Sequence, residues 1–322
     1  AISEVPQLWR SALQRWRVIN RRWKRNLDDA VAPDANEEYL FYQTLVGTWP
    51  IDAAGRAEPA VGSEYIERIQ AYMAKALKEA KVNTSWIQPN EPWDSAMSDF
   101  VAKVLDSSPK NKFIPSFLPV AEEIARLGAI NSLSQVALKL TAPGVPDIYQ
   151  GSEIWNFSLV DPDNRRPVDY EQRRQMLASL ETASPEDLLQ QWPDGRIKLF
   201  LTQRLLRVRR EHQALFKQGE YLPLTVNGTF ADCCVAFARE HEGKWIVVLA
   251  PRLSSRIGFP PVGEHWQDTT VELPAAFSRE GAQELFTHRQ LQPADPSVKL
   301  SDAMANFPFA VYTNQELQGA AI

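Results

Sequence analysis

The densest group of side chains that could do chemistry lies in the segment Asp161–Pro167, whose sequence is DPDNRRP. Carboxylates and amides hydrogen-bond to sugar hydroxyls, and the planar fork of arginine orients a carboxylate or bridges neighbouring hydroxyls. Two prolines restrict the backbone, so that less conformational entropy is lost on binding. The segment therefore predicts a sugar-binding loop with the candidate contacts Asp161, Asp163, Asn164, Arg165 and Arg166. The alternative is a cluster of Asp–Arg ion pairs that only shapes the loop.

These carboxylates are poor candidates for acid–base catalysis. Glycosyl transfer needs one carboxyl group that stays protonated near neutral pH, whereas adjacent arginines favour the charged forms of Asp161 and Asp163. Asp147 and Glu153 are further candidates by position, although Glu153 is better explained as a loop anchor that accepts hydrogen bonds from backbone N–H groups. We therefore assign no catalytic residue in this chain.

The loop follows a segment with the pattern of a buried strand. Gly144–Gly151, GVPDIYQG, is mostly apolar and is bounded by Pro143 and Gly151. A helix this short would be marginal, whereas a strand covered on both faces has this composition. Substrate-binding residues of α/β barrels lie beyond the C-terminal ends of the strands. We therefore expect the loop on the substrate side of a barrel strand.

The first 140 residues have the apolar spacing of helices, and the last 100 have the pattern of short strands. Helices are predicted over 7–27, 36–45, 64–82, 91–105 and 116–141, then from Tyr170, after an N-cap at Ser184, and over Ile197–Lys217. Strands are predicted over 221–226, 233–239, 245–250, 269–273 and 309–313. The sequence thus predicts three regions, 1–140, 141–218 and 219–322, of which the last is an antiparallel β-domain.

Composition narrows the classes of function. The 322 residues are 44% apolar and 23% charged with a net charge of −5, which is typical of a globular protein and gives no reason to expect nucleic acid. No apolar run approaches the roughly 20 residues that span a membrane. The adjacent Cys233 and Cys234 are predicted to be buried free thiols, which suits the cytoplasm. No nucleotide-binding or metalloprotease motif occurs and the four histidines are dispersed, so we predict neither a metal nor a cofactor.

Several segments resemble one enzyme family. PGVPDIYQGSEI at 143–154 is similar to the eighth-strand segment of the α-amylase superfamily, although Asp147 stands where that superfamily usually has an apolar residue. DPDNRRPVDY at 161–170 narrows the resemblance to the maltooligosyltrehalose synthases. Further matches cover nearly the whole chain: NEEYLFYQTLVGTWP at 36–50, KEAKVNTSWIQPN at 78–90 and LTQRLLRVRREHQALFKQGEYLPL at 201–224.

The resemblance implies part of an enzyme that converts the terminal α-1,4 linkage of a maltooligosaccharide into an α,α-1,1 linkage, as in trehalose biosynthesis. The catalytic carboxylates of the family lie upstream of these motifs, and a His-Asp-Thr-Lys segment should precede SEVPQLW at 3–9. The expected fold is therefore mixed α and β, the C-terminal part of a (β/α)8-barrel enzyme. Residues 1–140 would be an inserted helical subdomain and a barrel helix, 141–218 the last barrel strand, substrate-side loop and following helices, and 219–322 an antiparallel β-sandwich domain.

The resemblance also implies two partners, the maltooligosaccharide substrate and the N-terminal catalytic portion of the same enzyme. The candidate loop residues would lie near the subsite of the glucose that reorients, and the chain alone would be inactive. Two alternatives remain open. One is another glucan enzyme of the α-amylase superfamily, which would predict different residues at 161–170. The other is a non-catalytic module that binds glucan or a partner protein.

Overall fold

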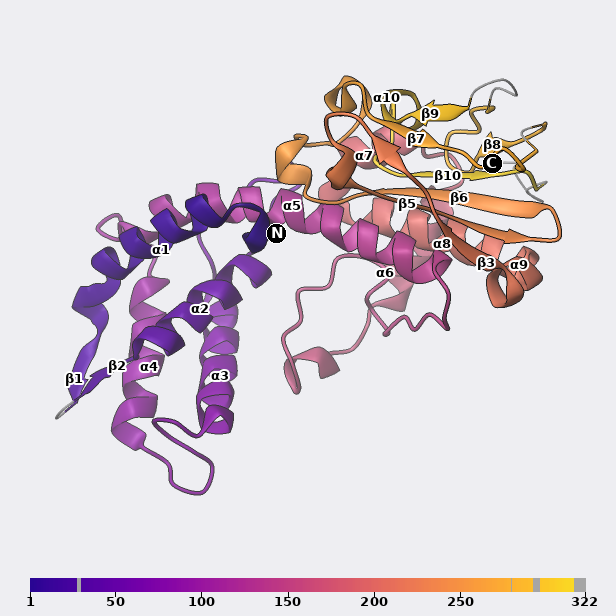
Figure 1. Ribbon diagram of the computed structural model, residues 1–322. Helices are drawn as coiled ribbons and strands as arrows, with labels where there is room; N and C mark the ends of the chain where they lie inside the picture. The colour runs from indigo at the N-terminus through magenta and orange to yellow at the C-terminus, as the bar shows by residue number, and fades with distance from the viewer. Residues whose placement is uncertain (28–29, 279, 292–295, 316–322) are drawn as a thin grey trace. The chain divides into compact units, whose positions relative to one another are not determined.

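Figure 1 shows the computed structural model, in which the chain divides into two units. The structure describes residues 1–27, 30–278, 280–291 and 296–315. The helical unit comprises residues 2–125 and 157–167, and the mixed unit comprises Ala1, residues 126–156 and residues 168–322. The long helix α5 (Phe113–Thr141) contributes its first part to the helical unit and its second part to the mixed unit.

The helices predicted for the first 140 residues are present. Besides α5 they are α1 (Pro6–Asn20), α2 (Ala35–Thr48), α3 (Ser63–Ala80) and α4 (Glu91–Val104). Helix α2 begins at a capping box, in which the Asp34 carboxylate accepts hydrogen bonds from the N–H groups of Asn36 and Glu37 at 2.8 and 2.9 Å. The Glu37 carboxylate in turn accepts from the Asp34 N–H at 2.9 Å. This reciprocal arrangement satisfies backbone donors that a helix N-terminus leaves open.

Trp16 lies at the centre of the core of the helical unit. Its side chain is fully buried, and its ring centroid lies 5.3, 5.7 and 5.4 Å from those of Tyr42, Phe113 and Phe117. Tilted and edge-on contacts of this kind suit the charge distribution of aromatic rings. The indole N–H donates to the Ser116 hydroxyl at 3.2 Å, so burial leaves no unpaired donor on this side chain.

The prediction of one helix over 7–27 is wrong at its C-terminal end. Helix α1 is followed by a 3-10 helix, Arg21–Trp23, and by β1 (Arg25–Leu27), which pairs antiparallel with β2 (Ala30–Ala32). The buried amide of Asn20 donates to the Tyr42 hydroxyl at 2.9 Å, and Lys24 pairs with the buried Glu38 at 2.6 Å. These contacts with α2 end the helix at a point that local apolar spacing does not mark.

The mixed unit adds five helices to the second part of α5 among the described residues. They are α6 (Tyr170–Ser179), α7 (Pro185–Gln190), α8 (Arg196–Glu211), α9 (Gln213–Gln218) and α10 (Leu300–Ala303). The predicted N-cap of α7 is confirmed, since the Ser184 hydroxyl accepts from the Asp187 N–H at 3.1 Å. The prediction of one helix over 197–217 is wrong. The backbone leaves helical geometry at His212, and the separate helix α9 buries Leu215 and Phe216.

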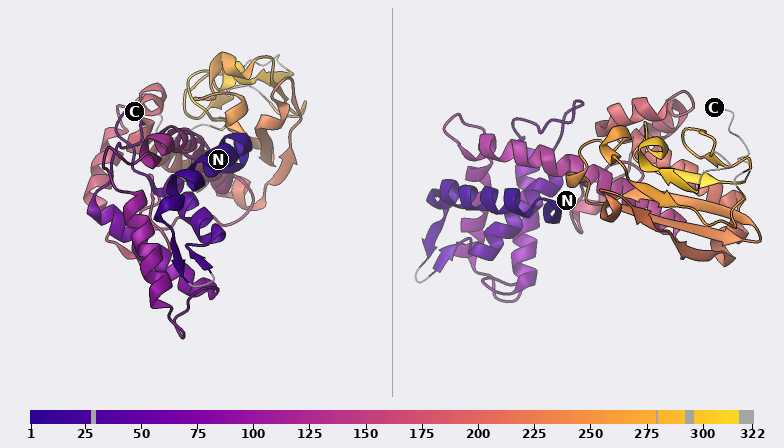
Figure 2. Two further views of the ribbon diagram at one scale, coloured as in Figure 1. Left: turned by 90° about the vertical axis from the view of Figure 1, so that its left-hand side faces the viewer. Right: turned by 45° about the horizontal axis from the view of Figure 1, so that its top comes forward.

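Two antiparallel sheets form the C-terminal part of the mixed unit, as the strand pattern predicts. The larger sheet has the order β3 (Glu220–Pro223), β5 (Cys234–His241), β6 (Lys244–Pro251), β10 (Ala310–Thr313), β8 (Gln283–Glu284). The smaller sheet has the order β4 (Val226–Asn227), β7 (Thr270–Glu272), β9 (Ser297–Lys299). The long β5–β6 hairpin is drawn in orange in Figure 2. The strand predicted over 221–226 is divided, because β3 ends at Pro223 and Val226 pairs with Val271 of the smaller sheet.

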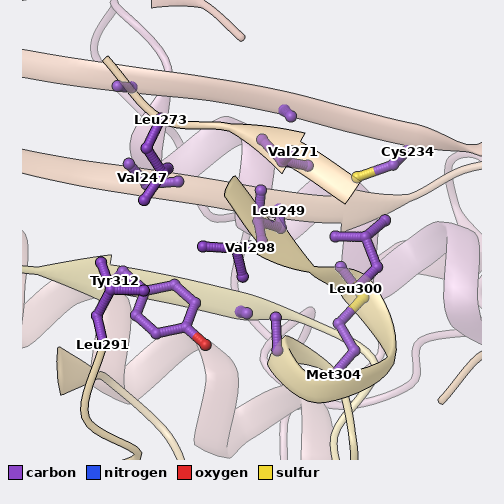
Figure 3. Close-up of a cluster of buried hydrophobic side chains, with 14 of the residues drawn as sticks. Cys234, Val247, Leu249, Val271, Leu273, Leu291, Val298, Leu300, Met304 and Tyr312 are labelled. Atoms are coloured by element: carbon purple, nitrogen blue, oxygen red, sulfur yellow. The ribbon is translucent and has the colours of Figure 1, made fainter. Parts of the chain in front are cut away.

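Both sheets share one hydrophobic core. Figure 3 shows Val247, Leu249 and Tyr312 of the larger sheet in one cluster with Val271 and Val298 of the smaller sheet. Each of these side chains is at least nine-tenths buried. The core explains why strands as short as β7 and β9 are stable, since packing supplies the stability that a short hydrogen-bonded ladder lacks.

No described helix has the length and apolar character needed to cross a membrane.

Arg239 of β5 joins the larger sheet to the ends of two helices. Its side chain is 2% exposed, and its guanidinium donates to four backbone carbonyls. The acceptors are Glu220 at 3.2 Å, Thr141 at 3.3 Å, Phe216 at 3.0 Å and Gly219 at 2.7 Å. Thr141 ends α5, and Phe216 and Gly219 lie at the end of α9, where helix carbonyls lack partners within the helix.

We predict that Arg239→Met lowers the free energy of unfolding by about 3 kcal/mol, because the buried carbonyls lose a charged donor. Urea unfolding followed by circular dichroism measures this change. The matched control is Arg210→Met on α8, whose side chain is exposed and whose loss should change the stability by less than about 0.5 kcal/mol. Equal stability of the two variants would contradict the role given to Arg239.

Candidate functional site

The candidate loop, residues 157–167, is held against α3 within the helical unit. The Arg68 Nε group donates to both carboxylate oxygens of Asp163 at 2.9 and 3.0 Å, and the same guanidinium donates to the Phe157 carbonyl. Seven residues further along α3, the Lys75 ammonium donates to the Asp161 carbonyl. Arg68 and Lys75 lie two helical turns apart and therefore on one face of α3. This face determines the path of the loop.

Asp163 has the environment of an anchoring residue. Its side chain is 16% exposed, as is that of its partner Arg68. One carboxylate oxygen also accepts from the Leu159 N–H at 2.6 Å, and the Arg166 guanidinium lies 3.5 Å from the other. Hydrogen bonds to a charged group are among the stronger ones in proteins. Asp163 therefore uses its carboxylate mainly to fold the loop.

Asp161 and Arg165 form an ion pair at the surface of the loop, with side chains that are 47% and 74% exposed. This pair is the one that the loop-shaping interpretation predicts. Its exposure also leaves polar atoms within reach of a ligand, so the sugar-binding interpretation stays a prediction. Exposed pairs of this kind contribute little to stability, which makes a purely structural role a weak explanation.

Asn164 and Arg166 complete the candidate set in two different environments. The side-chain oxygen of Asn164 is buried and has no hydrogen-bond partner among the residues that the structure describes. Arg166 is half exposed, and its Nε donates to the Asp163 carbonyl at 3.2 Å. The loop thus brings all five predicted residues into one turn of chain, with Asp163 directed inward and the two arginines outward.

The prediction of a strand over Gly144–Gly151 is wrong. No residue of this segment lies in a strand, and Val145 is 98% exposed. Its backbone is held by side chains instead, since Arg209 donates to the Gly144 carbonyl at 2.5 Å and Lys139 to the Asp147 carbonyl at 2.9 Å. A strand needs a neighbour to complete its ladder, and no described strand pairs with this segment.

Asp147 and Glu153 occupy unlike positions. Asp147 is exposed, whereas the Glu153 carboxylate pairs with Arg173 of α6 at 3.2 Å. Arg173 also donates to the Gly151 and Asp169 carbonyls, each at 3.0 Å. Glu153 therefore anchors the chain as expected, but its partner is the side chain of Arg173 and not a backbone N–H group. Neither carboxylate lies in a catalytic arrangement.

A pair of lysines near this segment had no signal in the sequence. Lys139 of α5 and Lys198 of α8 line a cavity of about 170 Å³ together with Ser132, Gln135 and Ser152. Burial lowers the pKa of Lys198 to about 8, and repulsion from Lys139 adds to the effect. The two residues are far apart in the chain and each fits an ordinary helix, so only the packing of α5 against α8 identifies them. Two amines in the lining of this cavity could donate hydrogen bonds to a hydroxyl-rich or anionic group, although Val136 and Ile148 make part of the lining apolar.

The cysteines have the predicted character. Cys233 and Cys234 are buried as free thiols, and burial raises the pKa of Cys234 to about 12. Among the described residues, no group of three histidine, cysteine, aspartate or glutamate side chains is arranged to hold a metal ion.

Comparison with known proteins identifies relatives of one kind, although no family model matches the chain. Proteins of Mycobacterium tuberculosis strains CDC 1551 and H37Rv, both assigned as maltooligosyl trehalose synthases, are 35% identical over 280 residues. The alignments cover 85% of this chain and 30% of each relative, so the chain spans less than a third of the length of these proteins.

Solved structures agree with the sequence relatives. A maltooligosyl trehalose synthase is similar with a TM-score of 0.74 at 28% identity, over 97% of this chain and 36% of that one. The enzyme from Arthrobacter ramosus gives 0.71 at 27% identity, over 97% and 35%. A hypothetical maltooligosyl trehalose synthase of Sulfolobus tokodaii gives 0.69 at 30% identity, over 97% and 36%. The resemblance read from the sequence is confirmed, and the coverage fits one portion of a longer enzyme.

We predict that Arg68→Met releases the loop from α3. Loss of the charged donor to Asp163 should cost about 1–3 kcal/mol locally, which corresponds to about 5- to 150-fold faster amide hydrogen exchange in 157–167. Hydrogen–deuterium exchange mass spectrometry measures this rate. Arg10→Met, which removes an exposed arginine of α1, is the control and should leave the loop unchanged. Unaltered exchange in the Arg68 variant would show that other contacts hold the loop.

Proposed function

We propose that the chain, related over most of its length to maltooligosyl trehalose synthases, is the C-terminal portion of such an enzyme. The complete enzyme would convert maltooligosaccharides to maltooligosyl trehalose by moving the terminal glucosyl linkage from α-1,4 to α,α-1,1. The observation that carries the proposal is the 35% identity over 85% of this chain. In this proposal the chain works in the cytoplasm, with the maltooligosaccharide and the N-terminal catalytic portion as its partners.

We assign the regions of the chain on the same basis. Residues 1–140 would supply an inserted helical subdomain and a barrel helix, residues 141–218 the last barrel strand with its loop and helices, and residues 219–322 a β-sandwich domain. The irregular backbone and the exposure of Val145 support the second assignment. A segment of apolar composition that pairs with none of the described strands can gain its hydrogen-bonded ladder from the strands of another portion.

The reaction in this proposal is a retaining double displacement. The nucleophile and the general acid come from the N-terminal portion, because the sequence offers neither here. A glucosyl–enzyme intermediate must be attacked by the anomeric hydroxyl of the remaining glucan, and any water that reaches the intermediate releases glucose instead. A wall of polar side chains that holds the sugar and excludes water therefore controls the product.

The loop 157–167 is proposed as part of that wall. Asp161, Arg165 and Arg166 have exposed polar atoms, and Asn164 has an acceptor without a protein partner among the described residues. The sequence also predicts a sugar contact for Asp163. Since its carboxylate is engaged by Arg68 and by the Leu159 N–H, we propose that Asp163 acts mainly by positioning the loop.

We predict that Asp161→Ala combined with Arg165→Ala in the complete enzyme lowers the rate of isomerisation about 10- to 100-fold and raises the fraction of glucose released. This change in rate corresponds to the loss of one to two charge-assisted hydrogen bonds to the sugar. Chromatography of the products from maltopentaose measures both quantities. The matched control is Glu171→Ala with Arg174→Ala, an exposed ion pair of α6 at 3.1 Å. If rate and product ratio are unchanged, the loop does not contact the sugar.

The isolated chain should form no trehalose-ended product, since it carries no catalytic carboxylate of the family. Incubation with maltoheptaose followed by product analysis tests this, and trehalose-ended products from the purified chain would overturn it. Calorimetric titration with the same sugar distinguishes the competing function. Tight binding without turnover, even when the N-terminal portion is added, would favour a non-catalytic glucan-binding module.

A further inference from the structure

An exposed tryptophan, Trp86, lies in the connection between α3 and α4. This connection, Lys81–Asn90, extends past the ends of both helices in Figure 1. Trp86 is 60% exposed and its neighbour Ile87 is 90% exposed. Both belong to the segment 78–90, which resembles the synthase family. The function proposed for the 157–167 loop does not involve this segment. The exposure of a large rigid side chain at such a place calls for a physical explanation.

Hydrogen bonds within the turn define the path of the backbone that carries Trp86. The Ser85 N–H donates to the Gln88 carbonyl at 3.2 Å, and the Gln88 N–H donates to the Ser85 hydroxyl at 2.9 Å. Thr84 is 4% exposed, and its hydroxyl accepts from the Asn90 N–H at 3.0 Å. These bonds close both sides of the segment that carries Trp86.

A further contact joins the turn to the start of α2. The Asn83 amide donates to the Asp34 carboxylate at 2.8 Å and to the Glu37 carboxylate at 3.0 Å, and these are the two members of the capping box. Preorganised side chains lose little entropy on binding, which favours rigid aromatic platforms as ligand contacts.

Helix α3 connects this tryptophan with the candidate loop. The Lys78 ammonium lies 4.9 Å from the centroid of the Trp86 ring and 3.5 Å from the Asp94 carboxylate. Lys75, which holds the Asp161 carbonyl, is three residues earlier on the same helix. Side chains three residues apart are neighbours on a helix, with about 5–6 Å between their Cβ atoms. The two features therefore contact neighbouring side chains on one side of α3.

We infer that Trp86 is an outer subsite for the maltooligosaccharide chain, in which the indole ring stacks on the apolar face of a glucosyl residue beyond those held by the 157–167 loop. The inference rests on the proposed function, because it needs a glucan as substrate. The Lys78 ammonium lies over the ring, and Gln88 is exposed two residues further along the chain, so both side chains can supply hydrogen bonds to sugar hydroxyls. The subsite gives the enzyme an additional contact that only the longer substrates make.

A glucan fits this surface better than a protein does. The exposed large apolar side chains of the turn are Val82, Trp86 and Ile87, and most of its other residues are polar. A stable protein interface uses roughly 20–30 residues a side. A sugar ring needs one aromatic face and a few polar neighbours, which is what the turn presents.

The test compares substrates of two lengths in the complete enzyme. Trp86→Ala should raise KM for maltoheptaose about three- to tenfold and leave kcat unchanged, because the contact is the same in the ground state and the transition state. KM for maltotriose should change by less than about twofold, since that substrate does not reach the subsite. Trp86→Phe should recover most of the affinity for maltoheptaose. The control Ile87→Ala alters the same turn without removing the ring, and should have no effect that depends on substrate length.

Each outcome decides the inference. An equal change of KM for both sugars, or no change for either, overturns it. A change of oligomeric state by sedimentation in both Trp86→Ala and Ile87→Ala also overturns it, because the turn is then a protein interface. If the unmodified enzyme makes no trehalose-ended product, the proposed function fails. In that case, calorimetry compares the affinity of the unmodified protein and of Trp86→Ala for maltoheptaose. Weaker binding by the variant supports the subsite, and equal binding overturns it.

Discussion

The buried guanidinium of Arg239 is the contact on which the organisation of the mixed unit depends. A buried cation normally requires a carboxylate partner, because desolvation is expensive. Arg239 is held by four carbonyls, three of which lie at the C-terminal ends of α5 and α9. Those ends carry the negative pole of each helix dipole, so the helices themselves supply the compensating charge. One side chain of β5 thereby fixes where two helices end and how the larger sheet meets them.

Local signals predicted the elements whose ends are set by neighbouring residues in the chain. Ser184 before Pro185 predicted the start of α7, and apolar spacing predicted α3 and α4 closely. Elements whose ends are set by distant residues were predicted poorly. Helix α1 ends where Asn20 meets Tyr42, and the break at His212 follows from the burial of Leu215 and Phe216. Periodicity reports which face of a helix is buried, and it does not report what lies opposite.

The segment at 144–151 shows a different limit. Its composition is that of a strand buried on both faces, yet its backbone is held by Lys139 and Arg209. A β-strand needs a neighbouring strand to satisfy its backbone hydrogen bonds, whereas a helix satisfies them within its own segment. The two aspartates of the loop show the same dependence. Asp161 and Asp163 have similar sequence neighbours, but Arg68, 95 residues away, engages one of them and leaves the other exposed. Sequence could therefore predict the loop and its residue types, and only the structure separates their roles.

The adjacent thiols of the larger sheet have a practical consequence for spectroscopy. Cys233 and Cys234 are the two cysteines of the chain, and burial raises the pKa of both thiols, so that neither forms the reactive thiolate readily. A cysteine introduced at an exposed position such as Ile87 would react with maleimide dyes while the native pair stays intact. Energy-transfer measurements from single labelled sites are thus possible in the native background, without first removing the cysteines that the core of the β-sheets needs.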